Sequence, residues 1–503
     1  MTYLAEKKMK NIYLFYTSNN PLIPHFPESV LYLAAALRDN GFQSTIFDPD
    51  ILPESELNII DPLFIGISIY TNESILKGLK YARKIRNSFP DTLIVWGGPH
   101  AQLAPEETAR HTLVDVVCYD EGEKVVVDIA KQLSNKYWNP SIIGGIIYKK
   151  NNQIIRNPPN KLLDADEIPF PDYSALKKSV YFISQNKIYY QSSRGCPFQC
   201  SFCSYKHGRK WRGKSFEKVL SEIDRIISEF NPSEIYFSDA NFFVDLKRAK
   251  RICMGIIEKE YHFKWSAFCR VDTIQKMSAD FLKLLKKSGC YKLDIGGESG
   301  ADEVLEKYNK GITRKMIIDS VKKISNENII PELSFIIGVP FETSQNIKET
   351  LSLIETLEKE YTLTSINGYF QYQPYPNTPL GERIIKEWQL PIPKSLEEWA
   401  QNPITIPRRE YFPWLSRKQY NTMMMYTSIV SYKFLYNKLI NSAESQILCK
   451  KKFRFRILFF AAVLFHHSLI KLSIFIRLKM GVDMFPFEWK LYRRIRDKLL
   501  KMI

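Results

Sequence analysis

Three cysteines, Cys196, Cys200 and Cys203, lie in one short segment with a C-x3-C-x2-C spacing. Thiolates this close along the chain can bind one metal centre from a single loop. A closed structural zinc site takes four protein ligands, whereas a 4Fe-4S cluster held by three cysteines leaves one iron with an open position. The spacing therefore predicts an iron-sulfur cluster at which a further ligand can bind iron.

The alternative interpretation is that these cysteines are small buried hydrophobic residues, as many thiols in proteins are. The contrast with the rest of the chain favours the cluster, because the other five cysteines are scattered singly. No signal peptide is visible in the first residues, so we expect a cytoplasmic chain in which thiols stay reduced. The scattered cysteines are Cys118, Cys253, Cys269, Cys290 and Cys449.

The segment Ser193-Arg-Gly-Cys-Pro-Phe-Gln-Cys-Ser-Phe-Cys, with the aromatic Phe202 before the third cysteine, resembles the signature of the radical S-adenosylmethionine family. In that family the open iron binds the amino and carboxylate groups of S-adenosylmethionine. The resemblance implies a 4Fe-4S cluster on Cys196, Cys200 and Cys203, with Phe202 beside the cofactors. It also implies an electron donor such as a flavodoxin or a ferredoxin.

Residues 1–135 alternate short apolar runs with helix-length segments, which predicts a doubly wound, Rossmann-like α/β domain. Ligands of such domains bind at the carboxyl ends of the parallel strands. The loops of interest therefore begin at Thr17, Tyr70, Gly97 and Tyr119. The predicted strands are 11–16, 44–49, 64–71, 92–98 and 114–119, and the predicted helices are 27–40, 73–88, 105–111 and 122–133.

Small and hydroxyl-bearing residues occupy these loops, where a large flat ligand could approach the backbone. The segments Gly-Ile-Ser-Ile-Tyr-Thr, Trp-Gly-Gly-Pro-His and Glu-Gly-Glu together resemble the cobalamin-binding domain that precedes many radical S-adenosylmethionine domains. The resemblance implies that cobalamin contacts Ser68, Thr71, Gly97, Gly98, Glu121 and Gly122.

One departure concerns the lower ligand of cobalt. The chain lacks the Asp-x-His-x-x-Gly motif whose histidine replaces that ligand in other cobalamin domains. We therefore expect no histidine ligand from that motif, with the dimethylbenzimidazole tail displaced into the domain. His100, after Gly-Gly-Pro, is either a ligand near the corrin or a loop residue held by hydrogen bonds, and we favour the latter.

Residues 136–185 form a predicted connector, with a hairpin over 144–155 that turns at Asn151-Asn152 and a proline-stiffened stretch over 167–172. From 186 to 390 the β-then-α rhythm repeats six times, as in the partial (β/α)6 barrel of the family, with the cysteines after the first strand. The predicted strands are 188–193, 234–243, 263–271, 291–299, 332–340 and 366–376. The predicted helices are 216–230, 247–260, 278–288, 301–326 and 344–358.

Polar residues end several of these strands, among them Asp239, Arg270, Glu298 and Ser299. A zwitterion that carries a ribose needs such a mixture of carboxylate, cation and hydroxyl partners. Gly296-Gly-Glu-Ser-Gly300 resembles a family segment that holds S-adenosylmethionine, which makes Glu298 the leading contact. For Arg270 and Asp239 a structural salt bridge is the equal alternative.

Residues 391–503 are predicted to be mostly helical and basic. The last segment, 451–503, has thirteen Lys and Arg against three Asp and Glu, a net charge of +10 out of +17 for the chain. The apolar run 457–465 is interrupted by His466, His467 and Lys471 before it reaches the length of a membrane span. We favour a buried helix over an amphipathic anchor at the membrane surface. An anchor would mean peripheral membrane contact and a lipid-like substrate.

The combined resemblance predicts a cobalamin-dependent enzyme that methylates an unactivated carbon through a 5′-deoxyadenosyl radical and methylcobalamin. A radical cyclase that forms rings, as in the branch acting on porphyrins, is the enzymatic alternative, and a non-catalytic cobalamin or redox sensor is another. A tRNA methylthiotransferase would need three cysteines in its first domain, where only Cys118 occurs. We expect a small-molecule or lipid-like substrate and no nucleic acid.

Overall fold

The computed structural model describes residues 10–18, 26–176, 186–204 and 210–401, with 409, 412–417, 419, 420, 423 and 424. The end of the predicted connector and the apolar run 457–465 lie outside the described residues. The chain divides into two compact units. The first comprises Met1–Phe268 with Gln373–Pro407, and the second comprises Cys269–Tyr372 with Arg408–Ile503.

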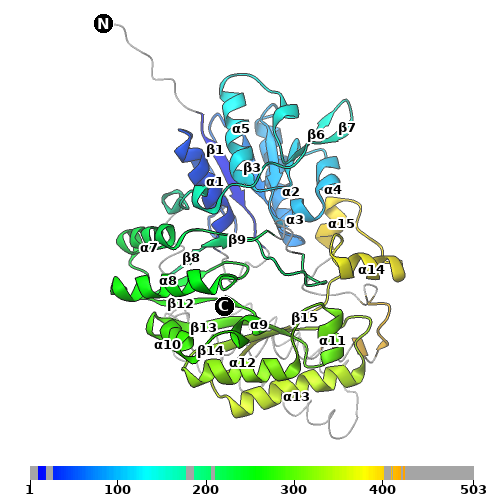
Figure 1. Cartoon of the computed structure of the whole chain (residues 1–503). Coiled ribbons are helices and arrows are strands. Elements are labelled where there is room, and N and C mark those ends of the chain that lie inside the picture. Colours follow the sequence, from blue (N-terminus) through cyan, green and yellow to red (C-terminus); the bar gives the residue numbers. More distant parts are fainter. Residues whose placement is uncertain are drawn as a thin grey trace, which may run out of the picture. The chain divides into compact units, whose positions relative to one another are not determined.

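The first unit contains a seven-stranded sheet of order β2-β1-β3-β4-β5-β6-β7 (Figure 1). Its first five strands are parallel and match the predicted ones, whereas β6 and β7 form the predicted antiparallel hairpin. Asn151 and Asn152 turn this hairpin with φ angles of 52° and 61°, a left-handed conformation that asparagine tolerates. The strands are β1 Ile12–Tyr16, β2 Ser44–Phe47, β3 Ile65–Ser68, β4 Ile94–Gly97, β5 Val116–Cys118, β6 Ile146–Lys150 and β7 Gln153–Arg156.

Helices cover both faces of this sheet, because its parallel strands are apolar on both sides. Helices α1 (Glu28–Asp39) and α5 (Gly122–Ser134) pack against each other, and α2 (Glu73–Ser88) packs against α15 (Leu396–Gln401). The short α3 (Pro99–Leu103) was not predicted. It begins at a proline, the residue favoured at the first helical position. The remaining helical turns are α4 Pro105–Arg110, η1 Glu54–Glu56, η2 Pro140–Ile142, η3 Ala165–Glu167 and η4 Tyr173–Ala175.

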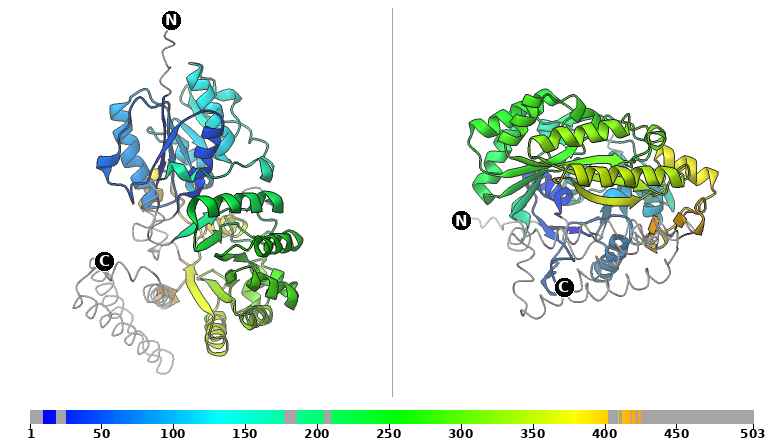
Figure 2. Two further views of the ribbon diagram at one scale, coloured as in Figure 1. Left: turned by 90° about the vertical axis from the view of Figure 1, so that its left-hand side faces the viewer. Right: turned by 90° about the horizontal axis from the view of Figure 1, so that it is seen from below.

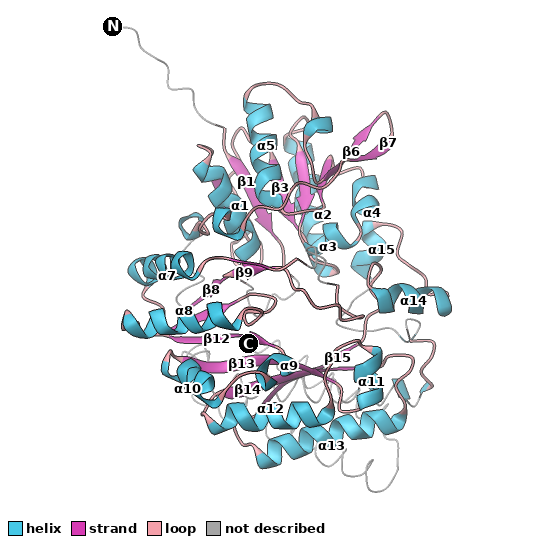
Figure 3. Cartoon of the chain, in the orientation of Figure 1, coloured by secondary structure: helices cyan, strands magenta, loops and turns pink. Residues whose placement is uncertain are grey.

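Six parallel strands form the second sheet, in the order β15-β14-β13-β12-β11-β8, and they confirm the predicted βα repeat (Figure 3). A separate two-stranded ladder pairs β9 (Ser193–Arg194) with β10 (Arg212–Gly213). The six strands are β8 Lys187–Tyr190, β11 Glu234–Phe237, β12 Lys264–Cys269, β13 Cys290–Glu298, β14 Ile330–Ile337 and β15 Ser365–Gln371.

The single helix predicted over 301–326 is wrong. The structure has α11 (Asp302–Lys307) and α12 (Arg314–Asn326), because Gly311 takes a φ of 68° and the Thr313 hydroxyl caps the new helix at Met316 N. Helices α12 and α13 lie side by side (Figure 2). The other helices are α7 Phe216–Phe230, α8 Leu246–Glu258, α9 Val271–Gln275, α10 Ala279–Lys287, α13 Ser344–Glu360 and α14 Pro379–Glu387.

Within the described part of the chain, no helix combines the length and apolar character that crossing a bilayer requires.

Candidate functional site

A cavity of about 300 Å³ opens at the carboxyl ends of the parallel strands in the first unit, and we call it the edge cavity. It lies beside β1 and β3, where the strand order reverses, which is where doubly wound sheets bind ligands. Its deeper wall is apolar, and its rim carries hydroxyl, carboxylate and guanidinium groups. The apolar wall includes Leu14, Leu33, Val95, Cys118 and Val126, and the rim includes Glu28, Ser68, Tyr70, Glu121, Glu123 and Arg194.

Glycines occupy places where the walls of the edge cavity pack closely together. A Cβ atom on Gly66 would lie 2.9 Å from Leu14 Cδ2, and one on Gly122 would lie 2.8 Å from Leu33 Cδ2. Gly98 has a φ of 91°, and a side chain there would meet the Ser68 hydroxyl at 2.7 Å. The glycines therefore let the lining elements approach one another closely, and the mostly apolar slot beside them fits the flat aromatic tail of a corrinoid.

Ser68 and Glu28 are two polar side chains of the rim that are at least partly removed from water. Ser68 is 7% exposed, and its Oγ has no hydrogen-bond partner among the described residues. Such a hydroxyl costs free energy unless a ligand or water satisfies it. The half-buried Glu28 accepts a hydrogen bond from Ser238 Oγ at 2.6 Å. Burial raises the pKa of Glu28 to about 7, although the bond from Ser238 opposes this.

Five of the six residues predicted to contact cobalamin line the edge cavity, namely Ser68, Gly97, Gly98, Glu121 and Gly122. Thr71 does not, because its hydroxyl lies 3.2 Å from His100 Nδ1 inside the domain. His100 is fully buried, packs edge-on against Trp399 and is absent from the cavity wall. Burial lowers its pKa to about 4, so the ring is neutral at neutral pH. The structure thus places His100 in α3 rather than in a loop, and its contacts with Thr71 and Trp399 favour a structural role over corrin ligation.

The predicted cluster ligands lie on the cysteine loop, residues 195–204, directly after β9. Cys196 and Cys200 are half-buried and Cys203 is exposed. Gly195 opens the loop with a φ of 87° and lies so close to the Lys210 carbonyl that no side chain fits. Further along, the Ser201 carbonyl accepts a hydrogen bond from Leu380 N at 2.9 Å.

Among the described residues, no three His, Cys, Asp or Glu side chains converge as ligands of a single metal ion. A 4Fe-4S cluster does not require such convergence, since each thiolate binds a different iron. A donor set of three thiols on one loop, without histidine or carboxylate, fits an iron-sulfur cluster.

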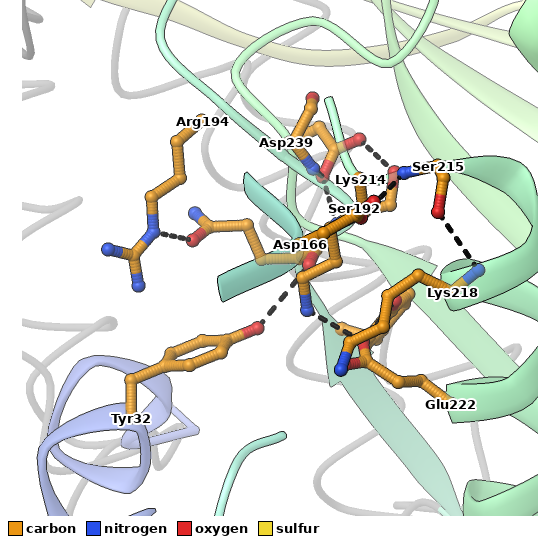
Figure 4. Close-up of polar contacts among 12 residues, drawn as sticks. Tyr32, Asp166, Ser192, Arg194, Lys214, Ser215, Lys218, Glu222 and Asp239 are labelled. Carbon is orange, nitrogen blue, oxygen red and sulfur yellow. Dashed lines mark hydrogen bonds and ion pairs between the residues drawn. The ribbon is translucent and has the colours of Figure 1, made fainter. Parts of the chain in front are cut away.

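The backbone that leads into the cysteine loop is fixed by Asp239, at the end of β11 (Figure 4). Asp239 Oδ1 accepts hydrogen bonds from the amides of Ser192 and Ser193 at 2.6 and 2.9 Å, and Oδ2 accepts one from Ser192 Oγ at 2.6 Å. Arg248 donates to the Ser192 carbonyl at 2.8 Å. Burial raises the pKa of Asp239, while Arg248 and these hydrogen bonds oppose the shift. Both oxygens are engaged by the protein, which fits the structural alternative for this residue.

Arg194 directly follows Ser193 in the same segment, and its side chain makes a separate set of contacts. Its guanidinium donates to Glu121 Oε2 at 3.2 Å, to Glu123 Oε1 at 2.6 Å and to Gln191 Oε1 at 2.8 Å. Arg212, its partner across the β9–β10 ladder, also forms an ion pair with Glu121. All these charges are nearly buried, and the two acidic and two basic groups balance.

A second buried ion pair involves Lys214, which directly follows β10. Lys214 Nζ lies 2.6 Å from Glu222 Oε2, which also accepts a hydrogen bond from the Tyr190 hydroxyl (Figure 4). Burial lowers the pKa of Lys214, and Glu222 opposes that shift. The strand ladder that carries Arg194 is thus anchored on both strands.

Three further predicted contacts belong to the second unit, whereas Phe202 is half-buried in the cysteine loop of the first unit. Glu298 ends β13 with a φ of 60°, and its Oε1 lies 2.7 Å from Lys310 Nζ. Ser299 Oγ lies 3.2 Å from Thr350 Oγ1. Arg270 donates to Asp272 Oδ1 at 2.8 Å and to the Lys310 carbonyl at 2.5 Å. The structure therefore brings Glu298 and Arg270 together through Lys310.

Sequence reasoning missed Arg194, Glu28 and Lys310. In the sequence Arg194 is part of the cysteine signature, and an arginine before the first ligand is a visible signal. Lys310 was hidden because it fell inside the single helix predicted over 301–326. Glu28 had no signal of its own, because its carboxyl becomes a rim group only when α1 meets Ser238.

Two family descriptions match the chain. "Radical SAM superfamily" covers residues 190–354, and "B12 binding domain" covers residues 23–130. A protein of Pyrococcus horikoshii, named as the uncharacterized methyltransferase PH0819, is 32% identical over 371 residues, which cover 71% of this chain and 78% of that protein. The anaerobic magnesium-protoporphyrin IX monomethyl ester cyclase of Rubrivivax gelatinosus is 24% identical, and the match covers 71% of this chain and 66% of the cyclase, just under two thirds.

The fold has a solved counterpart. The structure of OxsB, a cobalamin-dependent S-adenosylmethionine radical enzyme, aligns with a TM-score of 0.67 at 20% identity and covers 98% of this chain and 80% of that chain. At this identity the likeness concerns the fold alone. The sequence match to the Pyrococcus protein, together with both domain matches, shows that this chain belongs to the cobalamin-dependent branch of the radical S-adenosylmethionine superfamily.

Proposed function

We propose that this radical S-adenosylmethionine enzyme methylates an unactivated carbon of a small molecule, with a 4Fe-4S cluster, S-adenosylmethionine and cobalamin as cofactors. One observation carries the proposal. The edge cavity, which fits the aromatic tail of a corrinoid, includes in its wall Arg194, two residues before the predicted cluster ligand Cys196. When bound, these cofactors supply hydrogen abstraction by a radical and a donor methyl group, which is the hard chemistry of the reaction.

The residues of the chain itself would bind the cofactors and orient them. Cys196, Cys200 and Cys203 would hold the cluster. The glycine-lined slot would accept the corrinoid tail, and Ser68 Oγ would gain the hydrogen-bond partner that it lacks among the described residues. The apolar wall of the edge cavity excludes water from that tail.

In the second unit, Glu298 and Ser299 remain the proposed contacts to S-adenosylmethionine, with Lys310 Nζ paired to Glu298 and Arg270 fixing the Lys310 backbone. Phe202, next to Cys203, is the proposed apolar neighbour of the cofactors. Asp239 is proposed to act indirectly, through the segment that it fixes.

Methyl transfer is favoured over ring formation because PH0819 carries a methyltransferase name and further relatives do too. The Rubrivivax cyclase keeps a radical cyclase as the second candidate. A gain of one methylene in product mass would indicate methylation, and a loss of two hydrogens would indicate cyclisation.

The first test is anaerobic reconstitution with iron, sulfide and hydroxocobalamin, followed by optical and spin-resonance spectra. With a strong reductant, the loaded protein should cleave S-adenosylmethionine to 5′-deoxyadenosine. Cys200→Ala should lose the cluster signal and the cleavage. Cys253→Ala is the matched control, because Cys253 is buried in α8, outside the cysteine loop. A loaded wild-type protein that fails to cleave S-adenosylmethionine would favour a non-catalytic sensor, and a missing corrinoid band would contradict methyl transfer.

A flavodoxin or a ferredoxin is the proposed electron donor, and the cytoplasm the proposed compartment. Peripheral membrane contact through 451–503, and with it a lipid-like substrate, stays a prediction.

A further inference from the structure

One residue connects the two proposed cofactor sites of the first unit along the chain. Arg194 lines the edge cavity and stands two residues before Cys196. Its ion-pair partners, Glu121 and Glu123, line the same cavity from the start of α5. The side chains of these three residues are between 6% and 11% exposed, so the pairs are formed almost entirely inside the protein.

The backbone next to Arg194 has little freedom to absorb a movement of that side chain. Asp239 and Arg248 hold Ser192 on the amino-terminal side. On the carboxyl-terminal side, Gly195 is packed against the Lys210 carbonyl. The ion pairs of Arg194 therefore act on a segment that is already well ordered, and they add a further restraint two residues before Cys196.

Filling the edge cavity changes the surroundings of these ion pairs. In an empty cavity, water can solvate the facing sides of Glu121, Glu123 and Arg194. A bound corrinoid displaces that water, and attraction between opposite charges is stronger where the dielectric constant is lower. A ligand that favours one arrangement of a site shifts the population toward it.

We propose that Arg194 is a positioning residue that couples the two sites, so that a corrinoid in the edge cavity and the cluster on the cysteine loop bind cooperatively. Corrinoid binding strengthens the ion pairs of Arg194 with Glu121 and Glu123, and these pairs hold the backbone that presents Cys196. By thermodynamic linkage, the cluster raises corrinoid affinity by the same factor. The inference rests on the proposed function, since it takes these two places as the corrinoid and cluster sites.

The test measures binding rather than turnover. Hydroxocobalamin affinity is determined anaerobically by equilibrium dialysis for wild-type protein with and without its cluster. The cluster should raise the affinity about fivefold or more, the lower end of typical coupling between sites. A second readout is the rate at which an iron chelator strips the cluster, which hydroxocobalamin should slow. Arg194→Gln should abolish both effects, and Arg194→Lys should restore them in part, because lysine keeps the charge but not the two-pronged geometry.

Arg86→Gln is the matched control, because Arg86 pairs with Asp115 at 2.5 Å in the same domain but lines no part of the edge cavity. It should keep both effects. If Arg194→Gln fails to fold, Glu123→Gln removes one ion pair without touching the segment before Cys196, and it should weaken the coupling.

The outcomes separate the two proposals. A wild-type protein that binds no hydroxocobalamin or assembles no cluster overturns the proposed function. A wild-type protein that binds both independently, or an Arg194→Gln variant that keeps the full coupling, overturns only the role of Arg194.

Discussion

Asp239 accepts three hydrogen bonds from Ser192 and Ser193 and so fixes the backbone of the strand that leads into the cysteine loop. The relationship joins the segment just after β11 to Ser192 and to Ser193, the first residue of β9. It explains why a carboxylate at a strand end matters here even if it never touches a cofactor.

Asp239→Asn should therefore impair cluster assembly. An asparagine side chain has one acceptor oxygen, so at least one buried donor of Ser192 or Ser193 loses its partner, which costs about 1–3 kcal/mol. Iron and sulfide content after reconstitution and the urea midpoint both report the change. Asp128→Asn is the control, because Asp128 forms a surface pair with Lys124. Full cluster content in Asp239→Asn would contradict the positioning role.

Gly122→Ala should weaken corrinoid binding without unfolding the protein. The added methyl group would lie 2.8 Å from Leu33 Cδ2, a flexible side chain, and would occupy part of the edge cavity. Equilibrium dialysis with hydroxocobalamin measures the effect. Gly78→Ala is the comparison, because a Cβ there meets Ile69 and Trp96 in the core, away from the cavity. Equal corrinoid affinity in Gly122→Ala and wild type would argue against a ligand in this slot.

Glu28 should make stability depend on pH. Its pKa in the folded protein is about 7 and its ordinary value is 4.5, so the folded state holds the proton more tightly than the unfolded state. The resulting stabilisation is complete below pH 4.5 and is lost as the pH rises through 7. Glu28→Gln, which mimics the protonated form, should flatten the melting temperature across this window. Glu54→Gln should not change this pH dependence. Lys80 and Lys84 lower the pKa of Glu54 to about 2, which lies below the window.

His100 should not ligate cobalt, because it lies between Thr71 and Trp399 and outside the wall of the edge cavity. The spin-resonance spectrum of the cobalt(II) corrinoid should lack nitrogen splitting from histidine. His100→Asn should leave that spectrum unchanged while lowering the melting temperature. A spectrum that changes with this substitution would restore the ligand hypothesis.

Glu298→Gln should destabilise the second unit strongly, since it leaves Lys310 buried without its carboxylate. Breaking a buried ion pair from one side costs about 3–5 kcal/mol. Urea unfolding measures this, with Asp319→Asn as the control for an exposed pair with Lys315. A variant that keeps its fold but loses S-adenosylmethionine affinity would support the proposed contact, and unchanged affinity would leave Glu298 a structural role only.

Much of the architecture was readable from the sequence, because hydrophobic periodicity and turn residues act locally. The strands of both sheets, the turn at Asn151 and Asn152 and the exact span of α7 follow from such patterns. The break between α11 and α12 was missed, since Gly311 and the Thr313 cap are weak signals inside a long amphipathic stretch.

The sequence by itself determined which groups are available: three thiols on one loop, glycines after parallel strands and polar residues at strand ends. Only the tertiary structure decided what those groups do. It turned Thr71 and His100 inward, engaged both oxygens of Asp239 and set Arg194 against Glu121 and Glu123, residues more than seventy positions away. Spacing along a chain limits which atoms can share a loop, but the pairing of buried charges depends on packing between elements that are distant in sequence.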